Sequence, residues 1–334
     1  MSKINVAING FGRIGRITFR ALQNKPNVNV VAINDLTDNA TLAHLLKYDS
    51  VHGRFNGTVS SDEQNLIVNG KSIRALAERS PENLPWKDLD VDVVLECTGL
   101  FLDSAKAGGH LKAGAKRVIL SAPAKGDDIK MIVLGGNEET ITDDDKIISN
   151  ASCTTNCVSP LVKVIDELCG IENGYMMTIH AYTADQNLQD APHNDLRRAR
   201  AAALSLVPTS TGAAKAIGKV FPHLKGKLDG TSVRVPVPTG SLTDLSLIVK
   251  NPKSAEEINK AFKAAADGAL KGYLEYTEDE IVSADIVGST ASCIFDSKLT
   301  FVKENLVKVF GWYDNEFGYS NRLADLCEKL AGKN

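Results

Sequence analysis

The segment Gly10-Phe11-Gly12-Arg13-Ile14-Gly15, a G-x-G-x-x-G pattern, constrains the fold of this chain more than any other feature. It follows the short apolar run Ile4–Asn9 and opens a segment, residues 13–24, whose apolar side chains recur at helical spacing. A second apolar run, residues 28–33, leads to Asp35, which lies 20 residues after Gly15. This order of strand, glycine turn, helix, strand and acidic residue predicts a dinucleotide-binding βαβ unit.

Each glycine and the aspartate has an expected role in such a unit. Gly10 permits the tight turn, Gly12 lets a pyrophosphate approach the helix N-terminus, and Gly15 lets helix and strand pack closely. Asp35 is expected to accept hydrogen bonds from ribose hydroxyls, and its charge would repel a 2′-phosphate, which favours NAD over NADP. The alternatives are a glycine-rich turn without a ligand and a solvated aspartate at the end of a strand.

The length of 334 residues indicates about two domains, and the sequence pattern changes near Ala151. Before it, apolar strand segments alternate with helical ones, which is typical of an open, mostly parallel sheet. After it, residues 231–238 and 241–249 alternate apolar and polar side chains, which is typical of strands in an antiparallel or mixed sheet. We therefore expect an α/β fold whose second domain is α+β.

The composition excludes several classes of protein. A formal net charge of −3 argues against a nucleic-acid binder, which would usually carry a basic excess. No apolar run reaches the roughly 18 residues of a membrane span, and the N-terminus lacks a signal-peptide pattern, so we expect a cytoplasmic protein without a membrane partner. The six cysteines and six histidines show neither Cys-x-x-Cys nor His-x-x-x-His spacing, so no metal site is expected.

Two residues are candidates for nucleophilic chemistry. Cys153 follows an apolar strand and begins a helix, and the positive end of the helix dipole is expected to lower the pKa of its thiol. His180 lies in the alternating segment 176–182 and is the candidate base, because a reactive cysteine needs a base or cation within hydrogen-bond reach. The alternatives are a buried small residue at 153 and a structural histidine at 180.

Anion sites are also indicated. Thr211 and Gly212 precede an alanine-rich helix and offer hydroxyl and backbone donors at its N-terminus. Arg234 lies on the polar face of its strand, opposite Val233 and Val235, and could bind an anion or form a surface ion pair.

Five motifs, spread over nearly the whole chain, together resemble the phosphorylating glyceraldehyde-3-phosphate dehydrogenase family: NGFGRIGR, KYDSVHGRF, SNASCTTNC, PTSTGAAKA and WYDNEFGYSN. The resemblance implies a NAD-binding Rossmann domain with a doubly wound parallel sheet over residues 1–151, completed by a C-terminal helix at 316–334. It implies a catalytic domain over residues 152–315 and a homotetramer.

The resemblance also implies roles for individual residues. Cys153 is similar to the family's nucleophile and His180 to its base. Residues similar to the family's NAD contacts are Arg13, Ile14, Asp35, Arg79, Ser121 and Asn315. Thr183 and Arg234 resemble the family's pocket for the substrate's phosphate. The residues that resemble its site for inorganic phosphate are Ser152, Thr154, Thr211 and Gly212. Arg198 is similar to a further phosphate contact of the family, with Arg197 and Arg200 as alternatives. Pro192 is similar to the residue found in the members that prefer NAD.

The implied activity is the oxidation of glyceraldehyde 3-phosphate to 1,3-bisphosphoglycerate with NAD and inorganic phosphate, as in glycolysis and gluconeogenesis. It would proceed through a cysteine hemithioacetal and a thioester, which conserves the energy of oxidation. One alternative is erythrose-4-phosphate dehydrogenase, which shares the scaffold and the cysteine. Another is a dinucleotide-fold protein that binds RNA or a protein partner in the same groove.

Overall fold

The computed structural model describes residues 3–331 and divides into two compact units. Unit 1 contains the chain up to Ile132, the segment Glu139–Ala151 and the chain from Ser320 onward. Unit 2 contains Val133–Glu138 and Ser152–Tyr319. The chain passes from one unit to the other at Ala151, and its last helix begins in unit 2 and continues in unit 1.

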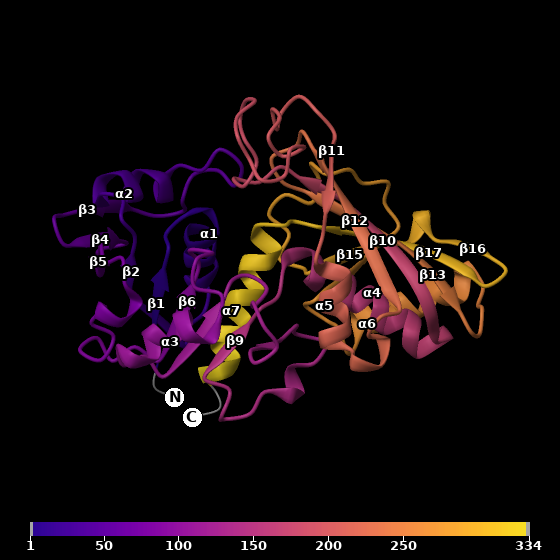
Figure 1. The fold of residues 1–334 in the computed structure, drawn as a ribbon, viewed down its shortest axis with the longest axis horizontal. Coiled ribbons are helices and arrows are strands. Elements are labelled where there is room, and N and C mark those ends of the chain that lie inside the picture. Colours follow the sequence, from indigo (N-terminus) through magenta and orange to yellow (C-terminus); the bar gives the residue numbers. More distant parts are fainter. Residues whose placement is uncertain (1–2, 332–334) are drawn as a thin grey trace. The chain divides into compact units, whose positions relative to one another are not determined.

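Unit 1 is built on a mostly parallel sheet, as the sequence predicts. In the described part of the chain this sheet has nine strands in the order β3-β4-β5-β2-β1-β6-β7-β9-β8. β1 lies between β2 and β6 and is parallel to both (Figure 1). The strands are β1 (Ile4–Asn9), β2 (Val28–Asn34), β3 (Val59–Ser61), β4 (Asn65–Val68), β5 (Lys71–Leu76), β6 (Val93–Glu96), β7 (Arg117–Leu120), β8 (Lys130–Met131) and β9 (Ile147–Ser149).

Four helices contribute to unit 1: α1 (Arg13–Leu22), α2 (Asn39–Lys47), α3 (Ser104–Lys112) and the C-terminal α7 (Phe317–Ala331). α7 buries Leu323, Leu326 and Leu330, and Lys25 pairs with its Asp325 and Glu328 at 2.5 and 3.1 Å. The helix expected at 316–334 thus corresponds to α7, while residues 332–334 lie outside the described residues.

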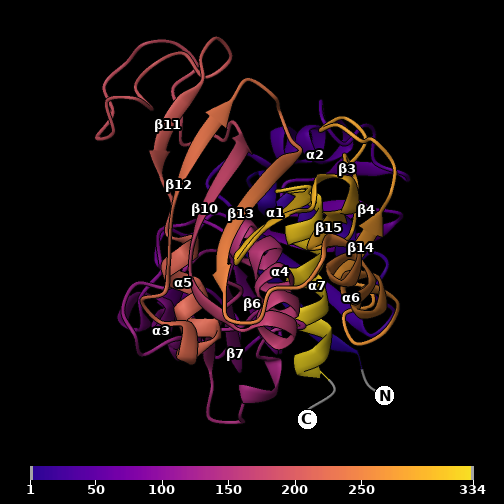
Figure 2. The same cartoon turned by 90° about the vertical axis from the view of Figure 1, so that its right-hand side faces the viewer.

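Unit 2 is built on a mixed sheet in the order β11-β12-β10-β13-β17-β15-β14, with β16 paired to β17. Figure 2 shows β11, β12, β10 and β13 side by side. β12 runs parallel to β10, whereas β13 runs antiparallel to it. The strands are β10 (Ile171–Ala181), β11 (Val207–Ser210), β12 (Leu228–Val235), β13 (Ser241–Val249), β14 (Leu274–Thr277), β15 (Cys293–Asp296), β16 (Phe301–Lys303) and β17 (Leu306–Tyr313).

Three helices pack against this sheet: α4 (Cys153–Cys169), α5 (Ala213–Val220) and α6 (Ala255–Asp267). Their apolar side chains form one core with buried residues of the sheet, including Leu245, Leu247 and Val249 of β13. The alternation predicted for β13 is therefore confirmed. On β12 the prediction is wrong: α5 packs against this strand and Ser232, on the polar face, is buried, whereas Val233 and Val235 are only half-buried. Short 3-10 helices lie at Pro81–Asn83, Glu138–Thr140, Pro222–Leu224 and Ser297–Leu299.

No helix within the described residues 3–331 is long and apolar enough to cross a membrane. In the same part of the chain, no group of three or more His, Cys, Asp or Glu residues could hold a metal ion.

Candidate active site

Cys153 is the first residue of α4, as the sequence predicts. Ser152 caps the helix, and its hydroxyl oxygen accepts a hydrogen bond from the Thr155 N–H at 3.1 Å. The chain enters the helix through Ala151, a buried residue whose φ of 54° is unusual for a side chain with a Cβ. Cys157, one turn further along, is fully buried in the core. Cys153, by contrast, is only half-buried.

The structure places the candidate base beside the candidate nucleophile. His180 is the penultimate residue of β10, and its Nε2 lies 3.4 Å from Cys153 Sγ. The other ring nitrogen, Nδ1, lies 2.7 Å from the Ala181 carbonyl oxygen, which can only accept. The two contacts of Nδ1 favour opposite tautomers, because the Ala181 oxygen only accepts and Arg234 Nη1, at 2.9 Å, only donates. In the tautomer with the proton on Nδ1, the lone pair of Nε2 can accept the proton of the Cys153 thiol.

The protonation of this pair differs from the expectation for Cys153. Burial raises the pKa of the Cys153 thiol to about 11, although the Arg234 guanidinium opposes this change. Burial, reinforced by Arg234, lowers the pKa of His180 to about 3. The prediction of a lowered thiol pKa is wrong, because burial outweighs the Arg234 guanidinium and the hydrogen bonds of Thr154, which favour the thiolate. Both shifts favour a neutral thiol beside a neutral imidazole.

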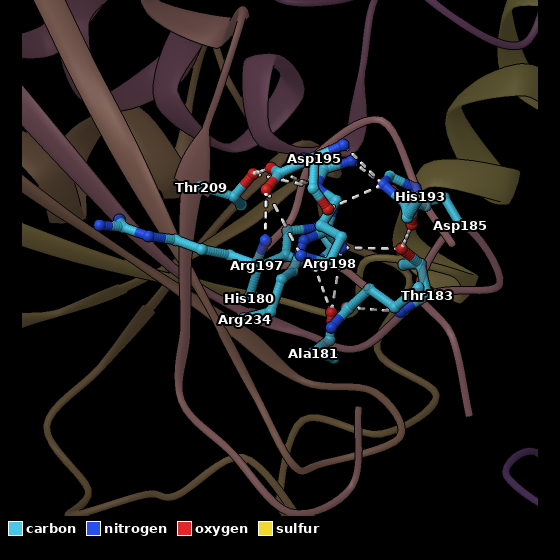
Figure 3. A network of polar contacts seen from close by, with 11 residues as sticks. His180, Ala181, Thr183, Asp185, His193, Asp195, Arg197, Arg198, Thr209 and Arg234 are labelled. Carbon is cyan, nitrogen blue, oxygen red and sulfur yellow. Dashed lines mark hydrogen bonds and ion pairs between the residues drawn. The ribbon is translucent and has the colours of Figure 1, made fainter. Parts of the chain in front are cut away.

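A cluster of arginine, threonine and aspartate side chains adjoins His180 (Figure 3). Arg234 is the register partner of His180 across β12 and β10. Its Nη1 donates to Thr183 Oγ1 at 2.9 Å and to the Ala181 oxygen at 3.1 Å. The same Nη1 lies 2.9 Å from His180 Nδ1, which explains how Arg234 disfavours the charged imidazolium.

Of the three adjacent arginines, Arg198 is the one that joins this cluster. Its Nε donates to Thr209 Oγ1 at 2.9 Å, and its Nη1 is paired with Asp185. Arg197 extends away from the other labelled side chains in Figure 3, and the exposed Arg200 pairs with Asp190 at 2.7 Å.

Three supporting residues of the cluster were missed by the sequence reasoning. Asp185 and Asp195 contact Arg198, and Thr209 bonds both Arg198 and Asp195. The only signal in the sequence is for the two aspartates, which belong to a set of three at 185, 190 and 195 that is followed by three arginines at 197, 198 and 200; Thr209 has none.

The residues expected to bind inorganic phosphate lie on α4 and α5. Thr154 is buried, and its hydroxyl contacts Tyr313 Oη at 2.9 Å, while Tyr313 also contacts Thr178 Oγ1 at 2.7 Å. Thr211 and Gly212 directly precede α5, which packs against α4. Gly212 caps α5 without a side-chain hydrogen bond, and a Cβ added there would meet nothing within 4 Å. The sequence reasoning missed Tyr313, although it lies in the WYDNEFGYSN motif.

The glycine turn of unit 1 has the geometry that a dinucleotide needs. Gly10 has a φ of 89°, and a Cβ there would lie 2.7 Å from Thr98 N. A Cβ on Gly15 would lie 2.1 Å from the Gly10 oxygen, so helix and strand pack closely only with glycine. Gly12 caps α1 without a side-chain bond and faces open space. The N-terminus of α1 thus has no side-chain cap, which suits the binding of a pyrophosphate.

The other residues expected to bind NAD lie near strand ends. Asp35 follows β2, accepting from Phe11 N at 2.8 Å and from Thr37 N at 3.0 Å. Arg13 pairs with Asp49 at 3.3 Å, and Ile14 beside it is half-buried on α1. The exposed Arg79 follows β5, and Ser121 follows β7.

Asn315 belongs to unit 2 and is buried just after β17. Its Oδ1 accepts from Ser241 Oγ at 2.8 Å, which fixes the orientation of the amide. Ser241 Oγ also accepts from the Ala181 N–H at 3.1 Å, so this serine connects Asn315 to the strand that carries His180.

Comparison with known proteins gives a consistent result over the whole chain. Residues 4–104 match the family model described as glyceraldehyde 3-phosphate dehydrogenase, NAD binding domain, and residues 152–315 match the C-terminal domain of the same description. The chain is 61% identical over 337 residues to glyceraldehyde-3-phosphate dehydrogenase of Mycobacterium avium, covering 99% of each chain. It is 60% identical to that of Mycobacterium tuberculosis over 99% of each chain, and 57% identical to that of Streptomyces coelicolor over 97% of each.

Proposed function

Because the chain belongs to the glyceraldehyde-3-phosphate dehydrogenase family, we propose that it oxidises glyceraldehyde 3-phosphate to 1,3-bisphosphoglycerate with NAD and inorganic phosphate. The observation that carries this proposal is the contact of 3.4 Å between Cys153 Sγ and His180 Nε2, beside Arg234 on the adjoining strand. A nucleophile, a base and a fixed cation are the groups that such a reaction requires.

Cys153 and His180 perform the covalent chemistry. The lone pair of His180 Nε2 takes the thiol proton as Sγ attacks the aldehyde carbon, and the proton passes to the new hydroxyl of the hemithioacetal. NAD, when bound, supplies the acceptor for the hydride of this intermediate. His180 takes the hydroxyl proton as the thioester forms. Inorganic phosphate then attacks the thioester carbonyl, and the departing sulfur of Cys153 recovers the proton from His180.

Two sets of residues serve the two phosphate groups. Arg234 and Thr183 bind the phosphate of the substrate, since a guanidinium and a hydroxyl on one side of His180 suit an anion there. Arg198 is the further cation of this cluster. Inorganic phosphate is held by Ser152, Thr154, Thr211 and Gly212, at the N-termini of α4 and α5.

Residues 1–151 with the C-terminal helix form the NAD-binding domain, and residues 152–315 form the catalytic domain. The NAD contacts of the first domain are Gly10, Gly12, Arg13, Ile14, Gly15, Asp35, Arg79 and Ser121. Asn315 adds an amide whose orientation is fixed by Ser241. The uncapped N-terminus of α1 and the carboxylate of Asp35 support this assignment.

The protein acts as a cytoplasmic homotetramer. The support for assembly is the loop between β10 and β11, where Leu188, Leu196, Leu204 and Leu206 are 81, 80, 84 and 68% exposed. Leucines at such exposure, close together in the sequence, suit a surface that a second copy covers.

The decisive experiment measures NADH formation by the purified chain from glyceraldehyde 3-phosphate, with and without inorganic phosphate. We expect steady turnover only when phosphate is present, because phosphate releases the acyl group from Cys153. Turnover that does not respond to phosphate would reject the phosphorylating reaction. A higher kcat/KM for erythrose 4-phosphate than for glyceraldehyde 3-phosphate would reject glyceraldehyde 3-phosphate as the preferred substrate.

A further inference from the structure

A buried carboxylate lies where the strand order of unit 1 changes direction. β2 lies on one side of β1 and β6 on the other, so the chain reverses its progress across the sheet between β1 and β6. Asn9 and Glu96 are the last residues of these two strands and are register partners. Both are buried, at 2 and 0% exposure. In open α/β sheets, ligands bind outside the carboxyl ends of the strands at this reversal.

Four donors converge on the carboxylate of Glu96. Oε2 accepts from Asn9 Nδ2 at 2.6 Å and lies 3.0 Å from His110 Nε2. Oε1 accepts from the Thr98 N–H at 2.8 Å and from the Thr98 hydroxyl. A carboxylate has an acceptor position for each of these four donors.

Trp86 fixes the tautomer of His110 that this arrangement requires. The indole Nε1–H of Trp86 lies 2.9 Å from His110 Nδ1, and an indole nitrogen only donates. Nδ1 must therefore be the acceptor, which assigns the ring proton to Nε2 and directs it at Glu96. Trp86 and His110 are both fully buried, so no water competes for these contacts.

The network reaches three segments that border the dinucleotide turn. Asn9 Oδ1 accepts from Asn34 Nδ2 at 2.7 Å, and the Asn34 side chain forms two bonds of 2.8 Å with the backbone of Glu78, next to Arg79. Thr98 packs so closely against Gly10 that no Cβ fits between them. The Glu96 carboxylate is thus bonded directly to the last residue of β1 and to Thr98, just after β6. Through Asn9 it is also linked to Asn34, the last residue of β2.

We propose that Glu96 is a positioning residue for NAD binding, which holds the glycine turn and its neighbouring segments in the geometry that the cofactor needs. This inference rests on the proposed function. Glu96 does not touch the cofactor itself; it acts through Asn9 and Thr98. The neutral isostere Glu96→Gln tests it, because an amide accepts only through its oxygen and must turn its NH₂ toward two of the four donors.

The test compares Glu96→Gln with Glu63→Gln, which makes the same change on an exposed residue of the same unit. We expect the Kd for NAD, measured by calorimetry on the full chain, to rise about 10-fold or more in Glu96→Gln only, since two charge-assisted bonds are lost. The rate of Cys153 alkylation without NAD reports on unit 2 and should not change. Adding Asn9→Asp to Glu96→Gln supplies a new acceptor for the amide and should restore part of the affinity.

The outcomes are distinct. A Kd for NAD that stays at the wild-type value in Glu96→Gln overturns the inference, and so does a joint change of Kd and alkylation rate, which indicates a general loss of structure. If Glu96→Gln is insoluble, Thr98→Val removes one donor to the carboxylate: a raised Kd supports the inference and an unchanged Kd overturns it. Failure of the wild-type chain to bind NAD rejects the proposed function instead.

Discussion

At the scale of single residues, reactivity of the cysteines depends on which thiol has both access and a base. Four of the six cysteines are buried: Cys157, Cys169, Cys293 and Cys327. Cys97 is half-buried, but burial raises the pKa of its thiol to about 12 and Glu96 adds repulsion. Cys153 has a nitrogen base at 3.4 Å and a guanidinium that attracts the thiolate.

We therefore predict that Cys153 is the first thiol alkylated by limiting iodoacetamide, with activity lost in step. His180→Asn should slow this alkylation near neutral pH, because the amide cannot take the thiol proton. The same variant should lose about 10²- to 10⁴-fold in kcat, the usual contribution of a positioned base. Peptide mapping and steady-state kinetics measure both effects. First labelling at Cys97 would reject Cys153 as the most reactive thiol. A normal kcat in His180→Asn would show that His180 has only a structural role.

Asp35 should control the choice between NAD and NADP. Its carboxylate already bonds the Phe11 N–H, so it belongs to the glycine turn as well as to the expected ribose site. Asp35→Asn removes the charge but keeps an acceptor, whereas Asp35→Ala removes both. We predict that both variants raise the ratio of kcat/KM for NADP to that for NAD. Asp35→Ala should lose about 10- to 100-fold in NAD affinity, the cost of charge-assisted hydrogen bonds, and Asp35→Asn should lose less because its amide oxygen still accepts. An unchanged cofactor ratio in both variants would place Asp35 away from the ribose.

At the scale of elements, the pairing of β10 with β12 decides which cation reaches the site. Their register sets Arg234 opposite His180, and β11 sets Thr209 beside Arg198. Arg197 is the sequence neighbour of Arg198, but its side chain extends away from this cluster (Figure 3). Arg234 and Arg197 therefore form a matched pair for mutation.

Arg234→Ala should reduce kcat/KM for glyceraldehyde 3-phosphate about 10- to 100-fold more than for unphosphorylated glyceraldehyde, because only the phosphorylated substrate loses a charge-assisted contact. A part of the loss shared by both substrates is expected, since Arg234 also acts on the protonation of His180. Arg197→Ala should leave both values unchanged. Equal losses on the two aldehydes in Arg234→Ala would show that this arginine does not bind the substrate's phosphate.

Elements with a local signal could be predicted from the sequence. The order β1, α1 and β2 follows from apolar runs around the glycine turn. The hairpin at Asn69 and Gly70 follows from two residues that tolerate positive φ, here 50° and 78°. Ser254 and Glu257, three residues apart, form the capping box that begins α6. In each case, residues a few positions apart determine the structure.

Features that depend on distant residues could not be predicted in the same way. The pKa of Cys153 is set by burial under other elements, which the helix N-terminus does not reveal. Asp185 and Thr209 support Arg198 from the loop after β10 and from β11, without any periodic pattern. Glu96, His110 and Trp86 come from three separate segments, and each taken singly has the sequence context of an ordinary core residue.

At the scale of the whole molecule, assembly should depend on the exposed leucines of the loop between β10 and β11. Leu196→Asp combined with Leu204→Asp places two charges on that surface, and their desolvation would oppose a buried contact. We predict that sedimentation gives a tetramer for the wild-type chain and smaller species for the double variant. Lys263→Asp on the exposed side of α6 provides a control for added acidic charge. A double variant of unchanged mass would remove the loop from the assembly surface.

The stability of the whole chain in acid should report the protonation of one buried ring. The pKa of His180 is lowered from 6.5 to about 3 by burial and by Arg234. Above about pH 6.5 the imidazole is neutral in both the folded and the unfolded chain, so it contributes nothing to the pH dependence of stability. Below it, only the unfolded chain binds the proton, and the fold loses stability as the pH falls toward 3. At 1.36 kcal/mol per unit, this loss is about 2 kcal/mol at about pH 5.

His180→Asn lacks this proton-binding group and should not suffer the loss. We predict that, between about pH 7 and about pH 5, the free energy of unfolding falls about 2 kcal/mol more in wild type than in His180→Asn. In a Trp86→Phe background, Trp312 is the remaining tryptophan, so its emission during urea unfolding reports on unit 2. A thiolate–imidazolium pair would raise the pKa of His180 and reverse the sign, because the folded chain would then bind the proton first. A wild-type chain that gains stability relative to the variant as the pH falls would therefore establish the ion pair and contradict the neutral pair.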